Sequence, residues 1–295
     1  MFTLGIDTGA TSIKSGVVDE KGKIKNFIKI KNQFANGENF LIKQLAGIIN
    51  DYKKIFPIKK AGIGFAGSVN FKRGIIIGTA NMNGIKNLYI KRDLEKKCDI
   101  EITVDNDAHC FALAETHFGA GKNYKDILCI TLGTGIGGGI IIDKKLCRGA
   151  DNTAGKIGHI IIDKNSDIKC GCGGFGHWES FTSGKALAKL YKVATEQEVD
   201  AEIIAEMAGR GEKIAQKVII EAGYNFAIGI ANLLNILNPE IVIIGGSLIK
   251  IDLLWNTFLN NLPSFLEGKA VANTKIVKSK FGDEAGVIGA SLLFK

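Results

Sequence analysis

The sequence lacks the features that mark membrane-bound and secreted proteins. No apolar run reaches about 18 residues, the length that a membrane-spanning helix needs. The first residues, MFTLGID, have a strand-like pattern, without the basic leader and apolar core of a secretory signal. No low-complexity linker divides the chain. We therefore expect a soluble, cytoplasmic protein that does not associate with membranes.

Clusters of basic residues are also missing. Lysine and arginine (38) outnumber aspartate and glutamate (30), which gives a net charge of +8, but the basic residues are spread along the chain. No Lys/Arg-rich run and no recognition-helix pattern is present, so we expect no nucleic-acid partner. The charge is expected to do little more than attract anionic substrates.

The cysteines do not form the pattern of a disulfide framework, because most lie in apolar stretches, as buried reduced thiols do. They are Cys98, Cys110, Cys129, Cys147, Cys170 and Cys172. The last two differ from the others, because they stand in KCGCGGFGHWE (169–179) beside an imidazole and a carboxylate. Cysteines one residue apart are poorly placed to bond to each other. This pair therefore needs a different partner.

A metal ion is one candidate partner. A closed, tetrahedral, structural Zn²⁺ takes four Cys and His ligands. The chain can supply them as His159, Cys170, Cys172 and His177. The Cys-x-Cys spacing is tighter than that of common zinc fingers, so spacing alone leaves an accident of composition open. His109 and His117 fall in a predicted amphipathic helix and read as ordinary helix residues.

The 295 residues, 46% of them apolar, can bury a large core, and strands that alternate with helices predict an α/β architecture. LGIDTGATSIKSGVVD (4–19) and LCITLGTGIGGGIIID (128–143) align without a gap, each as a strand, a glycine-rich turn and a strand. This internal repeat predicts two lobes of similar build. Helical patterns cover 183–208 and 212–237.

We place the N-terminal lobe at 1–118, with a C-terminal helix at 283–295 packing back on it. The second lobe is placed at 119–282 and contains the zinc-binding segment 156–179.

The two glycine-rich turns are candidate phosphate-binding loops, because glycine lets several backbone N–H groups approach an anion. Neither is a Walker A motif, and either one alone is more often a plain hairpin turn. Two copies in register favour the interpretation that ATP binds with its phosphates in contact with one loop from each lobe. A third glycine pair, after IVII, offers flat backbone for adenine. The cofactor-binding candidates are Asp7, Gly9, Thr11, Lys14, Thr134, Gly135, Gly245 and Gly246.

Asp107, in VDND, stands between a predicted strand and a predicted helix. Aspartate is a good helix N-cap, so capping is one interpretation. The second is catalysis, because a carboxylate can accept the proton of an alcohol that attacks a phosphoryl group. The two roles are compatible, since a helix N-terminus favours negative charge.

Together these residues resemble the ROK family (repressors, open reading frames and sugar kinases) over nearly the full chain. DTGATSIK is similar to the family's D-x-G-G-T-x-x-K phosphate loop, LGTGIGGG to its second phosphate loop, and VDNDA to its catalytic-aspartate segment. GKIGH and CGCGGFGHWE are similar to the E-x-G-H and C-x-C-G-x-x-G-C-x-E signatures, the second of which is highly specific. The resemblance implies a two-lobed, actin/hexokinase-like (ribonuclease H-like) ATPase fold that closes on a sugar, and a homodimer.

The resemblance also implies roles for individual residues. Asp107 would remove the proton from the sugar hydroxyl as it attacks the γ-phosphoryl of Mg-ATP. The zinc would hold His159 by one ring nitrogen, while the other nitrogen faces a sugar hydroxyl. The implied sugar-binding residues are Gly67, Asn81, Asn106, Lys156, His159 and Glu179.

Three departures from the family pattern bear on function. Ala10 stands where the phosphate loop usually has a second glycine, which would add a methyl group near the phosphates. His177 replaces the third cysteine, a tolerable exchange for zinc. Lys156 replaces the glutamate of E-x-G-H, so an ammonium that can only donate stands in place of an acceptor.

The leading hypothesis is therefore an ATP-dependent kinase of a hexose or an N-acylhexosamine, similar to glucokinases or N-acetylmannosamine kinases. The alternative is a catalytically weakened, sugar-sensing or regulatory relative without a DNA-binding domain. Asp7 is only seven residues from the start, which argues against a DNA-binding repressor.

Overall fold

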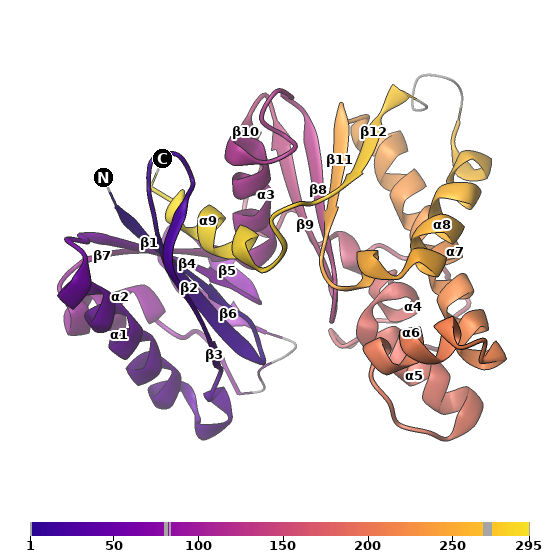
Figure 1. Ribbon diagram of the computed structural model, residues 1–295, viewed down its shortest axis with the longest axis horizontal. Coiled ribbons are helices and arrows are strands. Elements are labelled where there is room, and N and C mark those ends of the chain that lie inside the picture. The colour runs from indigo at the N-terminus through magenta and orange to yellow at the C-terminus, as the bar shows by residue number, and fades with distance from the viewer. Residues whose placement is uncertain (1, 80–81, 83, 268–272, 295) are drawn as a thin grey trace. The chain divides into compact units, whose positions relative to one another are not determined.

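The computed structural model describes residues 2–79, 82, 84–267 and 273–294 (Figure 1). The chain divides into two compact units. The first comprises Met1–Cys129, Gly139–Gly155 and Ser279–Lys295, and the second Ile130–Gly138 and Lys156–Lys278. The chain therefore passes between the units four times.

The first unit is built on a five-stranded sheet in the order β3-β2-β1-β4-β7. These strands are β1 (Thr3–Thr8), β2 (Ser12–Val18), β3 (Ile24–Lys31), β4 (Lys60–Phe65) and β7 (Glu101–Asn106). β1, β4 and β7 are parallel, whereas β2 and β3 run antiparallel to their neighbours. A small hairpin joins β5 (Ser68–Asn70) and β6 (Ile75–Gly78).

The helices of the first unit are α1 (Glu38–Ile55), α2 (Ile90–Cys98), α3 (Asp107–Phe118) and α9 (Ala285–Ser291). In α1 the buried residues Leu41, Leu45, Ile49 and Tyr52 recur every three or four positions, which gives the helix one apolar face. That face belongs to a core that includes Leu4 and other residues of β1, β2 and β4. The C-terminal α9 packs against α3 and β1.

The second sheet has the order β10-β9-β8-β11-β12. Its strands are β8 (Ile127–Leu132), β9 (Ile136–Ile142), β10 (Lys145–Leu146), β11 (Ile241–Gly245) and β12 (Lys275–Lys278). The helices of the second unit are α4 (Glu179–Thr182), α5 (Gly184–Thr195), α6 (Ala201–Gly209), α7 (Lys213–Leu237) and α8 (Asp252–Asn261). The predicted strand–turn–strand repeat is confirmed as the β1–β2 and β8–β9 pairs, and the predicted α/β class is confirmed.

The predicted helix over 183–208 is wrong in one respect, because the structure has two helices there. α5 ends at Thr195, the next residue, Glu196, takes the left-handed conformation (φ 63°), and α6 starts after Asp200. Glutamate is a good helix former, so its sequence pattern hid the break.

Helix α7 is long and apolar enough to cross a membrane by length and composition alone. However, 56% of its most apolar window is buried inside the protein, as in a core helix. Trp178 stacks on Phe226 of this helix with ring centroids 5.3 Å apart, and its indole N–H donates to the Asn225 carbonyl at 3.0 Å. Gly229 leaves the space that the indole fills. α7 therefore anchors the chain just after the Cys/His segment, which we define as residues 159–177.

Close approach of α9 to α3 gives a stability prediction. A Cβ on Gly289 would overlap the Cys110 carbonyl oxygen, so we expect Gly289→Ala to lower the free energy of unfolding by about 3 kcal/mol. Gly47, in α1, has open space within 4 Å of the position that a methyl group would take, and Gly47→Ala should stabilise by about 0.4–1 kcal/mol. Urea unfolding of both variants checks this, and equal stabilities would contradict it.

Candidate active site and metal cluster

Asp107 occupies the first position of α3, directly after β7. The N-cap is Asn106, whose side-chain oxygen accepts from the backbone N–H groups of Ala108 (3.0 Å) and His109 (3.4 Å). The capping interpretation of Asp107 is therefore wrong by one residue. The Asp107 carboxylate accepts from the Ala108 N–H at 3.0 Å and from the Asn106 amide at 2.8 Å. The turn thus presents a carboxylate at a positive helix end.

Asn106 also donates to the Gly67 carbonyl at 2.9 Å. Its amide therefore makes two donor and two acceptor hydrogen bonds within the protein. Two predicted sugar-binding residues, Gly67 and Asn106, are brought together beside Asp107 in this way. Asn81, a third, lies outside the described residues.

The first glycine-rich turn joins β1 and β2. The Gly9 N–H donates to the Ser12 carbonyl at 3.0 Å, and the Asn32 side chain donates to the Gly9 carbonyl at 2.7 Å. Thr11 is exposed at the turn. Ala10 is partly buried and packs against the apolar core of this unit.

Asp7 and Lys14 face each other across β1 and β2, with Lys14 Nζ 3.5 Å from the Asp7 carboxylate. Burial raises the pKa of Asp7, which Lys14 only partly opposes. Burial alone would lower the pKa of Lys14, but Asp7 and Asp283 outweigh it and raise that pKa. Lys14 therefore remains a cation at the predicted phosphate loop.

Sequence reasoning missed Asp283, which lies beside the predicted phosphate-loop residue Lys14. It lies in the 3₁₀ helix Gly282–Glu284 and accepts from Lys14 at 3.0 Å and from Lys29 at 2.8 Å. The hydrogen bond from Lys29, with those of Lys14, holds the pKa of Asp283 below its usual value. In the sequence, Asp283 is only an acidic residue that precedes a short apolar helix, and no motif marks it.

The second turn joins β8 and β9, with Thr134 exposed at its tip. Its carbonyl groups accept from the start of α5: Gly184 N–H to Gly133 at 2.8 Å and Lys185 N–H to Thr134 at 3.4 Å. The Glu179 carboxylate accepts from the Ile136 N–H at 2.8 Å, and a Cβ on Gly135 would meet it at 2.5 Å. Glu179 therefore supports this turn directly.

The third glycine pair closes β11. Gly246 has φ 102°, and a Cβ there would overlap the Leu132 carbonyl oxygen. Only glycine tolerates this conformation and this contact with β8. Ser247, which follows, lies close to Gly133 of the second turn. Gly245 is buried at the end of its strand.

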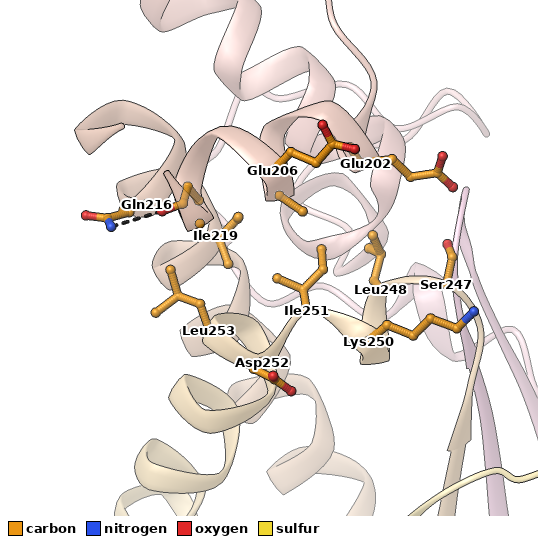
Figure 2. A pocket seen from close by; sticks show the side chains of 14 residues that line it. Glu202, Glu206, Gln216, Ile219, Ser247, Leu248, Lys250, Ile251, Asp252 and Leu253 are labelled. Atoms are coloured by element: carbon orange, nitrogen blue, oxygen red, sulfur yellow. Dashed lines mark hydrogen bonds between the residues drawn. The ribbon is translucent and has the colours of Figure 1, made fainter. Parts of the chain in front are cut away.

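A cavity of about 750 Å³ opens beside Ser247 (Figure 2). Ile219, Leu248 and Ile251 give it an apolar floor, while Glu202 and Lys250 extend polar groups near its edge. It lies entirely within the second unit, between α6 and the segment after β11. Its size and lining fit a small organic ligand with polar substituents.

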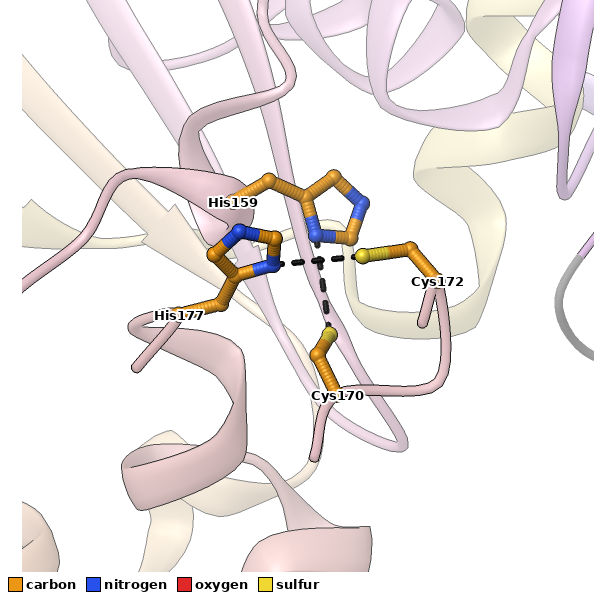
Figure 3. A group of neighbouring side chains, drawn as sticks. All are labelled: His159, Cys170, Cys172 and His177. Carbon is orange, nitrogen blue, oxygen red and sulfur yellow. Dashed lines mark hydrogen bonds between the residues drawn. The ribbon is translucent and has the colours of Figure 1, made fainter. Parts of the chain in front are cut away.

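The Cys/His segment forms a compact cluster (Figure 3). Its members are His159, Cys170, Cys172 and His177, with one ligand atom of each within 4.8 Å of the others. The Sγ–Nδ1 distances are 3.7 Å for Cys170 with His159 and 3.2 Å for Cys172 with His177. Tetrahedral zinc, with Zn–S and Zn–N bonds of about 2.3 and 2.1 Å, separates sulfur from nitrogen by about 3.6 Å. The donor set and spacing fit zinc.

The backbone around the thiols explains this geometry. The Cys170 N–H donates to the Gly174 carbonyl, and the Gly173 N–H donates to the Cys170 carbonyl, so the chain turns back on itself. Burial is the main cause that lowers the pKa of His159; the charge of Glu179 opposes this shift, and the charges of His177 and Lys156 add to it. A neutral ring is the form of histidine that binds metal. Because the charge of Lys156 contributes to the pKa shift, Lys156 lies near His159.

Each of the two sheets has a strand, a glycine-rich turn and a strand, and Asp107 stands at a strand–helix junction, as the resemblance to a two-lobed, actin-like ATPase fold implies. The chain belongs to the ROK family, whose model matches residues 3–295. This confirms the resemblance seen in the motifs.

Relatives and solved structures agree with this assignment. The chain is 29% identical to a glucokinase of Thermotoga maritima, over 99% of this chain and 96% of that protein. It is 31% identical to an N-acetyl-D-glucosamine kinase of Aliivibrio salmonicida, over 98% of both chains. A ROK family glucokinase of Streptomyces griseus, solved with glucose and AMPPNP, superposes with a TM-score of 0.87 at 30% identity and 99% coverage of both chains. The predicted fold is thereby confirmed.

Proposed function

We propose that the protein is an ATP-dependent sugar kinase that phosphorylates a hydroxyl of a hexose or an N-acylhexosamine. The observation that carries the proposal is the Asp107 carboxylate, held at the start of α3 by Asn106 and the Ala108 N–H. The glucokinase and N-acetyl-D-glucosamine kinase relatives support the same activity.

In this reaction Asp107 accepts the proton of the sugar hydroxyl. The hydroxyl oxygen forms a bond to the γ-phosphorus, the bond between that phosphorus and the β–γ bridging oxygen breaks, and ADP leaves with the electron pair. Thr11 and Lys14 meet the transferred phosphoryl group, and Lys14 balances its charge. Thr134 and Gly135 contact the other phosphates through the second turn. Asp7 would hold Mg²⁺ through water, and Mg²⁺ would neutralise phosphate charge when bound.

The adenosine of ATP is proposed to occupy the cavity beside Ser247. The apolar floor suits a base, and Glu202 is a suitable acceptor for ribose hydroxyls. The nearness of Ser247 to Gly133 puts this cavity next to the second turn, where the phosphates would continue. Gly245 and Gly246 would then offer flat backbone for adenine, and Gly246 also allows the close backbone contact with β8.

The sugar is proposed to contact Gly67, Asn81, Asn106, Lys156, His159 and Glu179. Asn106 and Glu179 already make hydrogen bonds within the protein, so each must share its bonds with the sugar or exchange them. The zinc would hold His159 at Nδ1 and leave Nε2 for a hydroxyl. We also propose a cytoplasmic homodimer, which light scattering of the purified protein tests.

ATP consumption measured against glucose, mannose, N-acetylglucosamine and N-acetylmannosamine tests the proposed activity. We expect one or more of these sugars to support turnover, with ADP and a sugar phosphate as products. The absence of turnover with every sugar, together with sugar binding at equilibrium, would instead favour the sensing role.

Lys156 is expected to select the substrate. An ammonium group can only donate hydrogen bonds, so it suits an N-acetyl carbonyl better than a hydroxyl that must also donate. Lys156→Glu should shift the ratio of kcat/KM values toward glucose and away from N-acylhexosamines by about 1–3 kcal/mol. Lys164→Glu, an exposed change of the same charge, should leave the ratio as it was. If Lys156→Glu changes neither preference, Lys156 is outside the sugar pocket.

A further inference from the structure

Three ionisable side chains meet beside the Asp107 turn. The buried Asp105 carboxylate accepts from His109 Nδ1 at 2.9 Å and from Arg148 Nε at 2.8 Å. It also accepts from the backbone N–H of Asn106 at 2.8 Å. We call Asp105, His109 and Arg148 the Asp105 cluster. The cluster therefore holds the residue that caps α3 and orients Asp107.

His109 is held on both sides of its ring. Its Nε2 lies 3.0 Å from the Ala154 carbonyl oxygen, and its Nδ1 faces the Asp105 carboxylate, so both partners are acceptors. Burial raises the pKa of Asp105, but the hydrogen bonds and charges of His109 and Arg148 outweigh it and lower that pKa. A buried carboxylate is costly to leave without partners, so the Asp105 arrangement is stable only while both His109 and Arg148 remain.

The cluster joins the Asp107 turn to a distant segment of the same unit. Arg148 and Ala154 both belong to residues 147–155, which immediately precede Lys156. The guanidinium of Arg148 also stacks over the Phe71 ring at 3.9 Å. Arg148 is thereby fixed on two sides, and the segment is attached to Asp105 of β7 near one end and to His109 of α3 near the other.

Helix α3 contacts two further stretches where the first unit is entered or left. Gly139, where β9 enters this unit, lies against Ala112, because a Cβ there would overlap the alanine methyl. The Ser279 hydroxyl, just after the last crossing, donates to the buried Glu115 carboxylate. The helix that begins with Asp107 therefore contacts the chain near three of the four crossings.

We propose, on the basis of the kinase activity above, that Asp105, His109 and Arg148 are positioning residues for the general base. They fix the Asn106–Asp107 turn against residues 147–155 and so set the direction in which the Asp107 carboxylate points. None of the three needs to touch the substrate. Loss of Arg148 then lowers turnover through a misplaced base, not through weaker ATP binding.

Arg148→Met and Arg148→Lys test the proposal, with Arg92→Met as the matched control. Arg92 also bonds an aspartate (Asp93, 2.8 Å) and lies over a ring (Tyr89, 4.6 Å), but at the surface. We expect Arg148→Met to lower kcat about 10- to 100-fold, since a small misplacement of a catalytic group has effects of this order. The KM for ATP should stay within about twofold. Arg148→Lys should recover most of the loss, and Arg92→Met should have no effect.

Hydrogen exchange supplies a readout that does not depend on activity. In Arg148→Met, amides 106–109 and 147–155 should exchange about tenfold faster or more, while those of α1 keep their rates. Unchanged exchange in these two stretches would overturn the proposal, whether or not the protein is a sugar kinase. An active wild type with an unaltered kcat in folded Arg148→Met would overturn it too. A wild type without sugar-kinase turnover would contradict the proposed function separately.

Discussion

Asp107→Asn is expected to lower kcat by at least about 10²-fold, because the variant keeps the size of the side chain but loses the base that accepts the hydroxyl proton. The protein should remain folded, since the N-cap of α3 is Asn106 and not Asp107. Sugar affinity should change little. Steady-state kinetics and equilibrium sugar binding measure both effects.

The matched control for this variant is Asp51→Asn. Asp51 is exposed on α1 and forms a surface ion pair with Lys54, so its loss should leave kcat unaltered. If Asp107→Asn turns over at the wild-type rate, Asp107 is not the base, and another carboxylate must accept the proton.

Removal of a metal ligand is expected to have the second large effect. We expect about one zinc per chain, and Cys172→Ser should release most of it, because the cluster supplies only four ligand atoms. The sugar KM should then rise on the order of tenfold or more, since His159 loses the partner that orients its ring. Elemental analysis and kinetics on the same sample measure both.

Two further variants separate loss of zinc from loss of a cysteine. Cys147→Ser removes a thiol outside the cluster and should keep zinc and activity. His177→Cys exchanges one zinc ligand for another and should keep most of the metal, whereas His177→Ala should not. The two units should stay folded in all of these variants, because the core of the first unit lies elsewhere and Trp178 remains anchored on α7 in the second. Wild-type protein free of zinc, or Cys172→Ser with full zinc, would refute the site.

Features encoded by neighbouring residues could be predicted from the sequence. The strand–turn–strand repeats depend on apolar β-formers around glycines, and the structure has both. The Cys/His cluster was predictable because three of its four members lie within eight residues, so a single tight turn brings them together. Asp107 could be placed at a strand–helix junction, but not one residue inside the helix, because Asn and Asp are nearly equal as N-caps.

Other features were decided by the tertiary structure, because they join residues far apart in the chain. Asp283 meets Lys14 only because the C-terminal segment returns to β1 and β2. Arg148 meets Asp105, and Glu179 meets the Ile136 N–H, across 43 residues in each case. Periodicity and turn chemistry report which residues are buried or exposed along one element. They contain no information on which distant charge lies opposite, since that depends on how the sheets are ordered and where the chain crosses from one unit to the other.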